Sequence, residues 1–246
     1  VMVDSMRGAV SDWLHDVLSA DLYIAPAGFE DGATLPGQII AEAPRLSQTS
    51  AFSSYRKRKL HTGDGRIVLV AARLAAPSRS GFQFKATGPA DPWVGFERGE
   101  LLISEPLAYR LGLSPGDTLT LPTAGGDRAF TVAAVFRDFA SEHGRVFIDQ
   151  GHYRRHWRDE RVDTLALFAE RGDATALLDA VGDRFSAEHA LVFTGAREIY
   201  DESMAVFERT FRITEVLRLL SVLAAFVGIL SALMALQLER RKEYAI

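Results

Sequence analysis

The sequence predicts an α+β fold with two lobes, followed by one long helix that continues into a membrane-spanning helix. Residues 20–75 and 162–195 show strand patterns separated by helices, whereas strand patterns dominate residues 88–161. The twenty residues 219–238 carry no ionisable side chain. At about 1.5 Å of rise per residue they cover roughly 30 Å, the thickness of the hydrocarbon core of a bilayer. We therefore expect a membrane span at 219–238 rather than a buried core helix.

Composition excludes several classes of protein. The 246 residues have a formal net charge of −4, which does not favour a nucleic-acid-binding protein. The chain holds no cysteine, so that disulfides and thiolate metal sites are excluded. With 48% hydrophobic and 24% charged residues, the composition is that of an ordinary folded protein.

The first nineteen residues predict an amphipathic helix. Its apolar stripe at helical spacing consists of Met2, Met6, Val10, Trp13, Leu14, Val17 and Leu18. The helix begins without a cap, and the chain also ends at Ile246 without one. We therefore expect the sequence to be a piece of a longer protein.

Residues 20–100 give the first lobe and a boundary. "ADLYIAP" predicts a short strand, and "LPGQIIAEAP" predicts a short helix. The following stretch to residue 74 predicts a hairpin that turns at Gly63-Asp64-Gly65. Residues 75–100 are rich in Pro, Gly and Ser without sustained periodicity, which predicts a connection between lobes.

The next block predicts a β-rich lobe. After the strand "GELLIS", Ser104 is expected to cap a short helix that ends at Gly112. Pro115-Gly116-Asp117 predicts a tight turn. Three further strands are predicted in "DTLTLPT", "RAFTVAAVFRDF" and "GRVFIDQ".

The α/β pattern returns from Asp163. "DTLALFAE" predicts a strand, "DATALLDAVGDRFS" a helix and "ALVFTG" another strand. From about Ala196 a helical pattern runs without Pro or Gly as far as Gly228. Unbroken to Leu238, this helix would be on the order of 65 Å long, half of it in water and half in lipid.

Motifs for catalysis and metal binding are missing from the sequence. Without a Gly-x-x-x-x-Gly-Lys-[Ser/Thr] loop the chain is not expected to hydrolyse ATP by itself, and no Gly-x-Ser-x-Gly elbow is present. His152 and His156 lie four residues apart near Asp159, but an ordinary solvated helix is favoured over a metal site. We predict no catalytic, cofactor-binding or metal-binding residue, and no enzyme activity.

Two further groups of residues have alternative interpretations. The basic run Arg56-Lys57-Arg58-Lys59 could form a patch that binds nucleic acid or lipid headgroups. We favour a solvated hairpin edge, because neighbouring strand residues point to opposite faces and only two of the four side chains can lie together. The aromatic residues of the boundary segment either line a surface for an apolar substrate or partner or, as we favour, pack one lobe on the other. These residues are Phe82, Phe84, Trp93 and Phe96.

Three segments in order carry a resemblance to a known family. They are "LLISEPLAYRLGLSPGDTLTL", "FTVAAVFRDF" and the closing "LSVLAAFVGILSALMALQLERRKEYAI". With the opening helix, they resemble the extracytoplasmic domain and second membrane span of FtsX-like and MacB-LolC-type ABC transporter permeases. Tyr244 departs mildly from the family pattern. The first segment also resembles, in outline, AbrB-type swapped-hairpin DNA-binding proteins, which gives a rival interpretation.

The resemblance implies an outline for the whole chain. It predicts a stalk helix at 1–19, a porter-like α/β lobe at 20–87 and 162–195, a β-rich inserted lobe at 88–161, a second stalk helix at 196–218, a transmembrane helix at 219–238 and the start of a cytoplasmic segment at 239–246. The main domain would lie on the periplasmic side of the cell (inner) membrane.

The resemblance also implies a function. The permease would relay ATP-driven motion of a separate cytoplasmic ATPase to the outer face of the membrane, for export or extraction of a lipid, lipoprotein or peptide; an FtsX-like member would instead activate a cell-wall hydrolase. The implied partners are the ATPase, a second permease copy or half, and an extracytoplasmic protein, with no nucleic acid. ATPase coupling is implied for Glu239, Arg240, Arg241 and Glu243. The small residues Ala224, Gly228 and Ala232, spaced by four, predict close packing against another membrane helix.

Overall fold

The computed structural model describes residues 2–27, 32–63, 65–139, 141, 143–185 and 191–243. Within the helices at the two ends, the side chains of residues 2–6, 207, 210–215, 218 and 235–243 are left out of this description. The chain forms two compact units, one of residues 6–200 and one that contains residues 201–246 with the first five residues.

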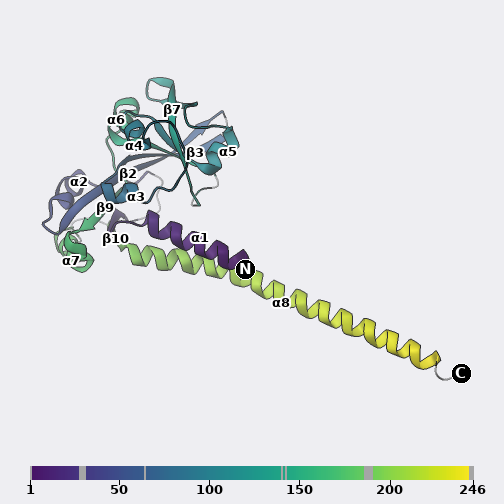
Figure 1. Ribbon diagram of the computed structural model, residues 1–246. Coiled ribbons are helices and arrows are strands. Elements are labelled where there is room, and N and C mark those ends of the chain that lie inside the picture. Colours follow the sequence, from purple (N-terminus) through teal and green to yellow (C-terminus); the bar gives the residue numbers. More distant parts are fainter. Residues whose placement is uncertain are drawn as a thin grey trace. The chain divides into compact units, whose positions relative to one another are not determined.

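The unit of residues 6–200 is built on one mixed sheet (Figure 1). In the described ranges its strands are β1 (Leu22–Pro26), β2 (Thr49–Thr62), β3 (Gly65–Arg73), β4 (Phe84–Thr87), β5 (Leu101–Ser104), β6 (Thr118–Thr123), β7 (Gly126–Phe136), β8 (Arg145–Asp149), β9 (Thr164–Ala169) and β10 (Leu191–Gly195). Their order is β10-β1-β9-β2-β3-β8-β5-β7-β4, and β6 pairs with β7. Most neighbours are antiparallel, whereas β3–β8 and β5–β7 are parallel.

Short helices lie beside the two ends of this sheet. They are α2 (Gly37–Glu42), α3 (Ala76–Ser80), α4 (Pro92–Glu97), α5 (Glu105–Leu111), α6 (Gln150–Trp157) and α7 (Ala174–Phe185), with 3-10 turns at 43–45 and 170–172. In Figure 1, α2 and α7 lie beside β9 and β10, and α4, α5 and α6 lie around β3 and β7. The helix predicted at the start of the chain is α1 (Met2–Val17).

The two predicted lobes share this sheet through the hairpin of β2 and β3. Residues 49–55 of β2 pair with β9, and residues 54–62 of β2 pair with β3. On its other side, β3 pairs with β8. Each end of the sheet has its own apolar core. Ile24, Ile39 and Phe185 belong to the core beside β9 and β10, whereas Leu60 and Ile67 of the hairpin pack into the core of the β-rich part. The predicted lobes are therefore two parts of one continuous sheet, each packed on its own apolar residues.

Residues 75–100, predicted as a connection between the lobes without sustained periodicity, contain three short regular elements among the described residues. The segment holds α3, β4 and α4, and β4 pairs with β7 of the β-rich part. The Asp91 carboxylate caps α4 by accepting a hydrogen bond of 2.8 Å from the amide of Trp93. These elements are 5, 4 and 6 residues long, which is too short for a periodic pattern to show in the sequence.

The block around α5 follows the prediction except at Ser104. Gly112 ends α5 in the left-handed conformation, with φ of 64°, as the C-cap prediction requires. At the turn, Gly116 has φ of 98°, and the Asp117 carboxylate accepts a bond of 2.8 Å from the Ser114 amide. Ser104 precedes α5 but its hydroxyl makes no cap, because it accepts a hydrogen bond from the Arg145 amide instead, at 2.8 Å.

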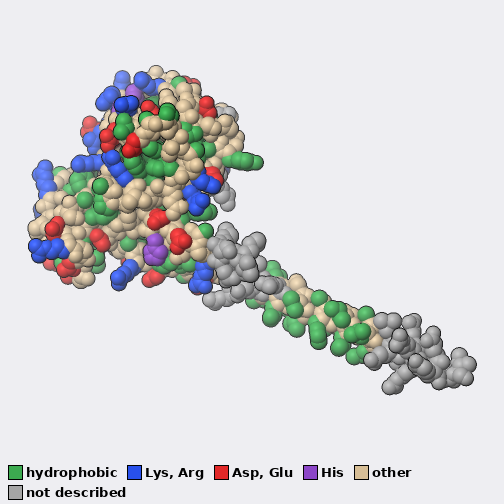
Figure 2. Space-filling view, in the orientation of Figure 1, with side chains coloured by type: hydrophobic (Ala, Val, Ile, Leu, Met, Phe, Trp, Pro, Cys, Tyr) green, Lys and Arg blue, Asp and Glu red, His purple; other side chains and the backbone are tan. Residues whose placement is uncertain are grey.

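The predicted long helix is α8 (Ala196–Glu243), a single helix of 48 residues. Apolar side chains between Val216 and Met234 are exposed, as Figure 2 shows along this helix. Residues 235–238, the last four of the predicted span at 219–238, lie outside the residues whose side chains the structure describes. Within the described residues, no helix meets the combined length and apolar character required to cross a membrane.

Candidate functional site

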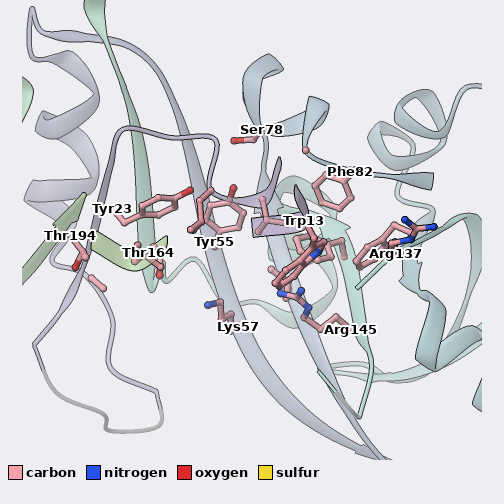
Figure 3. Close-up of a pocket in the computed structure, with 18 residues that line it drawn as sticks. Trp13, Tyr23, Tyr55, Lys57, Ser78, Phe82, Arg137, Arg145, Thr164 and Thr194 are labelled. Carbon is pink, nitrogen blue, oxygen red and sulfur yellow. The ribbon is translucent and has the colours of Figure 1, made fainter. Parts of the chain in front are cut away.

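A pocket of about 370 Å³ opens on one face of the sheet in the unit of residues 6–200 (Figure 3). Its floor comes from the shared hairpin, with Tyr55 and Lys57 on β2 and Val70 on β3. Tyr23 of β1 and Thr164 of β9 line it from one half of the sheet. The other half contributes the aromatic rings of Phe82, Phe136 and Phe147 and the cations Arg137 and Arg145. The pocket thus lies where the two halves of the sheet meet.

The C-terminal part of α1 forms one wall of this pocket. Trp13 and Val17 line it, and the Trp13 ring meets the edge of Phe139 with centroids 5.8 Å apart. The Asp16 carboxylate accepts a hydrogen bond from the side-chain amide of Gln83. The backbone carbonyl of Asp16 lies so close to Gly81 that a β-carbon there would come within 2.0 Å of it. Only glycine permits this approach, which fixes α1 against the loop between α3 and β4.

The tyrosines at the floor are neutral hydrogen-bonding groups. Burial, together with the neighbouring Tyr55, raises the pKa of Tyr23 above its usual range. Burial also raises the pKa of Tyr55, against the smaller effect of hydrogen bonds from Ser78 and Ser53. Both hydroxyls therefore stay protonated at neutral pH and can donate or accept hydrogen bonds at the pocket.

Three cations line the pocket. The Arg145 guanidinium forms a two-pronged ion pair with the buried carboxylate of Asp138, with Nε 2.7 Å from Oδ2. Arg137 contacts the amide oxygen of Gln83 at 3.3 Å. Protein atoms surround Lys57 on the concave floor although part of its surface is exposed; this desolvation, and then the charge of Arg145, lowers the pKa of the Lys57 amine, with a smaller opposing effect of Asp163.

The opposite face of β2 carries a buried ion network, which corrects the prediction of a solvated edge at Arg56, whereas Lys57 and Lys59 are exposed. Arg56 is 4% exposed and donates to Asp159 at 3.1 Å and to Asp163 at 2.5 Å. Asp159 also accepts from Arg161 at 2.8 Å and from the Tyr153 hydroxyl at 3.0 Å. Neighbouring strand residues point to opposite faces, so Arg56 enters this network while Lys57 lines the pocket.

Electrostatics hold this network together. Burial by itself would raise the pKa of the Asp159 carboxyl, but the bonds from Arg161, Tyr153 and Arg56 outweigh it and hold that pKa far below its usual range. Burial would likewise lower the pKa of Arg56, and the bonds to Asp163 and Asp159 raise it instead. Arg56 and Asp159 are therefore both charged at neutral pH.

The four aromatic residues singled out in the sequence lie in one cluster. Phe82, Phe84, Trp93 and Phe96 contact one another, with ring centroids 5.3 to 6.2 Å apart. Phe96 is 1% exposed and belongs to the core, and the other three are partly buried against it. Of the four, Phe82 lines the pocket. A role of this cluster in binding a substrate or partner stays a prediction.

His152 and His156 lie on α6 as predicted, with ring centroids 6.4 Å apart. Burial, then the charges of Arg128, His152 and Arg155, lower the pKa of His156. Among the described residues, no group of three or more His, Cys, Asp or Glu side chains is arranged to hold a metal ion.

The predicted residues of the long helix belong to the unit that contains residues 201–246, whereas the residues that line the pocket belong to the unit of residues 6–200. Ala224, Gly228 and Ala232 are exposed on α8. The side chains of Glu239, Arg240, Arg241 and Glu243 lie outside the described residues, as does Tyr244. Their roles in helix packing and ATPase coupling stay predictions.

Sequence reasoning missed the pocket itself. One signal was present, because Ser53, Tyr55 and Lys57 alternate along one face of a predicted strand. Nothing in the sequence indicated that Trp13, Arg137 and Arg145 would meet that face.

Comparisons with known proteins identify a related sequence and solved structures with the same fold. No family model matches the chain. Its sequence is 31% identical over 255 aligned residues to an uncharacterized ABC transporter permease protein of Mycobacterium tuberculosis, an alignment that covers 100% of this chain. The chain spans about 30% of the length of that relative.

Two solved structures share the fold. The periplasmic region of MacB from Actinobacillus actinomycetemcomitans is 11% identical with a TM-score of 0.53, over 78% of this chain and 95% of that one. The extracellular domain of the ABC-type transporter YknZ from Gram-positive bacteria is 11% identical with a TM-score of 0.50, over 72% of this chain and 99% of that one. This chain is therefore similar from end to end to a segment of an ABC transporter permease and has the fold of MacB-type extracytoplasmic domains, as the resemblance in its sequence implied.

Proposed function

We propose that this chain is the extracytoplasmic part and second membrane span of an ABC transporter permease. The observation that carries the proposal is the alignment of the whole chain with part of a permease, together with a fold shared with the outer domains of two ABC-type transporters. The chain would work with a separate cytoplasmic ATPase and a second permease copy or half, in the cell (inner) membrane. The AbrB-type alternative is not retained, because the strands β5 and β6 of the segment on which it rested belong to the same large sheet as the rest of the domain.

In this proposal α8 relays motion between the membrane and the outer domain. The helix begins at Ala196, directly after β10, and its first amide donates to the carbonyl of Asp21 at 3.3 Å. Tyr200, in the second turn of the helix, stacks on His15 with centroids 4.5 Å apart and shares a hydrogen bond of 2.8 Å with Ser11. A helix attached to the sheet in this way can transmit a displacement without a flexible linker. Glu239, Arg240, Arg241 and Glu243 would contact the ATPase at the other end.

The chain performs no covalent chemistry in this proposal. Lipids, lipoproteins or peptides would be handled at the outer face of the membrane, and ATP would be hydrolysed by the separate ATPase. Ala224, Gly228 and Ala232 would let another membrane helix approach α8 closely.

The test uses the complete transporter in lipid nanodiscs, with spin labels on the two outer domains. We expect ATP to change the distance between the labels in the wild type. Ala205→Pro, inside α8, removes a backbone hydrogen bond and should abolish this change while ATP turnover is retained, because an interior proline costs about 3 kcal/mol and kinks a helix.

Ala205→Ser is the matched control and should behave like the wild type. Arg240→Glu with Arg241→Glu should reduce assembly with the ATPase instead. An unchanged ATP-driven movement in the proline variant would show that α8 is not a mechanical element.

A further inference from the structure

The pocket between α1 and the sheet combines an apolar interior with an excess of positive charge. We propose that it binds an amphipathic anion, namely a molecule with an acyl chain or similar apolar body and a carboxylate or phosphate head. The head would lie against Lys57, and the apolar body along the aromatic rings. The proposal is independent of the transport function, since the pocket lies entirely within residues 6–200.

The charged side chains at the pocket favour a ligand with an anionic head. Asp138 forms the two-pronged ion pair with Arg145, and Asp163 forms an ion pair with Arg56 on the other face of β2. Asp163 accepts a hydrogen bond from the backbone amide of Lys57 at 2.6 Å, and its charge also acts on the Lys57 amine, with a smaller effect than burial and Arg145. Across the described part of the chain, the ammonium of Lys57 and the guanidinium of Arg137 have no ion-pair partner. Two cations without a direct ion-pair partner in a partly enclosed cavity attract an anion more strongly than they would in bulk water.

Neutral hydrogen-bonding groups complete the site for the head. Tyr23, Tyr55, Ser78 and Thr164 also line the pocket, and Figure 3 shows Tyr23, Tyr55 and Thr164 on the side opposite the arginines. Hydroxyl groups donate hydrogen bonds to carboxylate and phosphate oxygens, so the Tyr23 and Thr164 hydroxyls can contribute to binding the head. The Tyr55 and Ser78 hydroxyls already share hydrogen bonds with each other and with Ser53.

The walls suit an apolar body. Trp13 and Val17 of α1, with Leu18 directly after it, line the cavity together with the rings of Phe82, Phe136 and Phe147. Its volume of about 370 Å³ falls within the range of about 300–1,000 Å³ that is common for pockets that bury a small ligand, and a few placed polar groups in an otherwise apolar lining are typical of such sites.

The test measures binding of ten-carbon probes to the full chain held in a non-ionic amphipol, by calorimetry and tryptophan fluorescence. We expect decanoate, decyl phosphate or both to bind saturably with one site per chain. Decan-1-ol and decylammonium, which have the same chain without the anion, should bind at least tenfold more weakly. The comparison of decanoate with decyl phosphate distinguishes a carboxylate head from a phosphate head.

Variants locate the site. Lys57→Met should weaken binding of the anionic probe at least tenfold, whereas Lys59→Met, two residues along the same strand and outside the pocket lining, should change it less than threefold. Val17→Trp, at an exposed position of α1, should fill the cavity and abolish binding even if Lys57→Met fails to fold. Equal binding of decanoate and decan-1-ol, no saturable binding at all, or full binding by the Val17→Trp variant would overturn the proposal.

Discussion

The buried ion network around Asp159 gives the sharpest prediction about stability. Asp159 and Arg56 are 7% and 4% exposed, and Asp159 accepts hydrogen bonds from Arg56, Arg161 and Tyr153. Asp159→Asn keeps the shape of the side chain and removes its charge. Arg56 would then be buried with Asp163 as its remaining carboxylate partner among the described residues.

The size of the effect follows from this geometry. Breaking a buried ion pair by removing one partner costs about 3–5 kcal/mol, because it leaves a buried charge without compensation. Asp163 still compensates part of the charge of Arg56, at 2.5 Å, so we expect the lower end, a loss of about 3 kcal/mol.

The assay is urea unfolding of the full chain in one mild detergent, followed by tryptophan fluorescence. Trp157 reports on this region because it stacks on Tyr153, with ring centroids 5.2 Å apart. The matched control is Glu42→Gln, which breaks the exposed pair of Glu42 with Arg184 and should cost less than about 1 kcal/mol. If Asp159→Asn costs no more than this control, the network does not stabilise the fold and the reasoning from burial is wrong.

Two further predictions concern acid and the position of α1. The Asp159 pKa in the folded protein is held below its unfolded value of about 3.9, so the stability that the Asp159 carboxylate contributes is complete above that value and is lost as the pH falls further. In urea unfolding between about pH 6 and pH 2, the free energy of unfolding of the wild type should therefore decrease below about pH 4. The decrease should be less steep for Asp159→Asn. Gly81→Ala places a β-carbon 2.0 Å from the Asp16 carbonyl and should cost about 1–3 kcal/mol with faster amide exchange in residues 9–17, whereas Gly37→Ala, whose β-carbon meets nothing within 4 Å, should leave that exchange unchanged.

The sequence predicts the regular elements well where local signals are strong. Gly112 ends α5 as expected, and the alternation of apolar residues marks the strands of the sheet. The helices α3 and α4 were missed because each is shorter than two turns. Such elements owe their stability to tertiary packing, here to Phe96 in the core, rather than to any local pattern.

The functional features were harder to predict, for a physical reason. The solvated edge expected for residues 56–59 was wrong for Arg56, because its partners Asp159 and Asp163 lie about a hundred residues away in the chain. The pocket joins Trp13, Lys57 and Arg145, which meet through the pairing of distant strands. A single sequence carries no signal for such a meeting, whereas the family resemblance did indicate the fold.

The pairing of β1 sets the order in which this domain can be completed during synthesis. Residues 22–26 lie between β9 and β10, whose residues 164–169 and 191–195 emerge from the ribosome far later. Until then both edges of β1 lack their native partners, and closing so long a loop slows folding. Open strand edges of this kind pair readily with other chains, so the nascent domain is most prone to aggregation in the interval before residue 195 has left the ribosome.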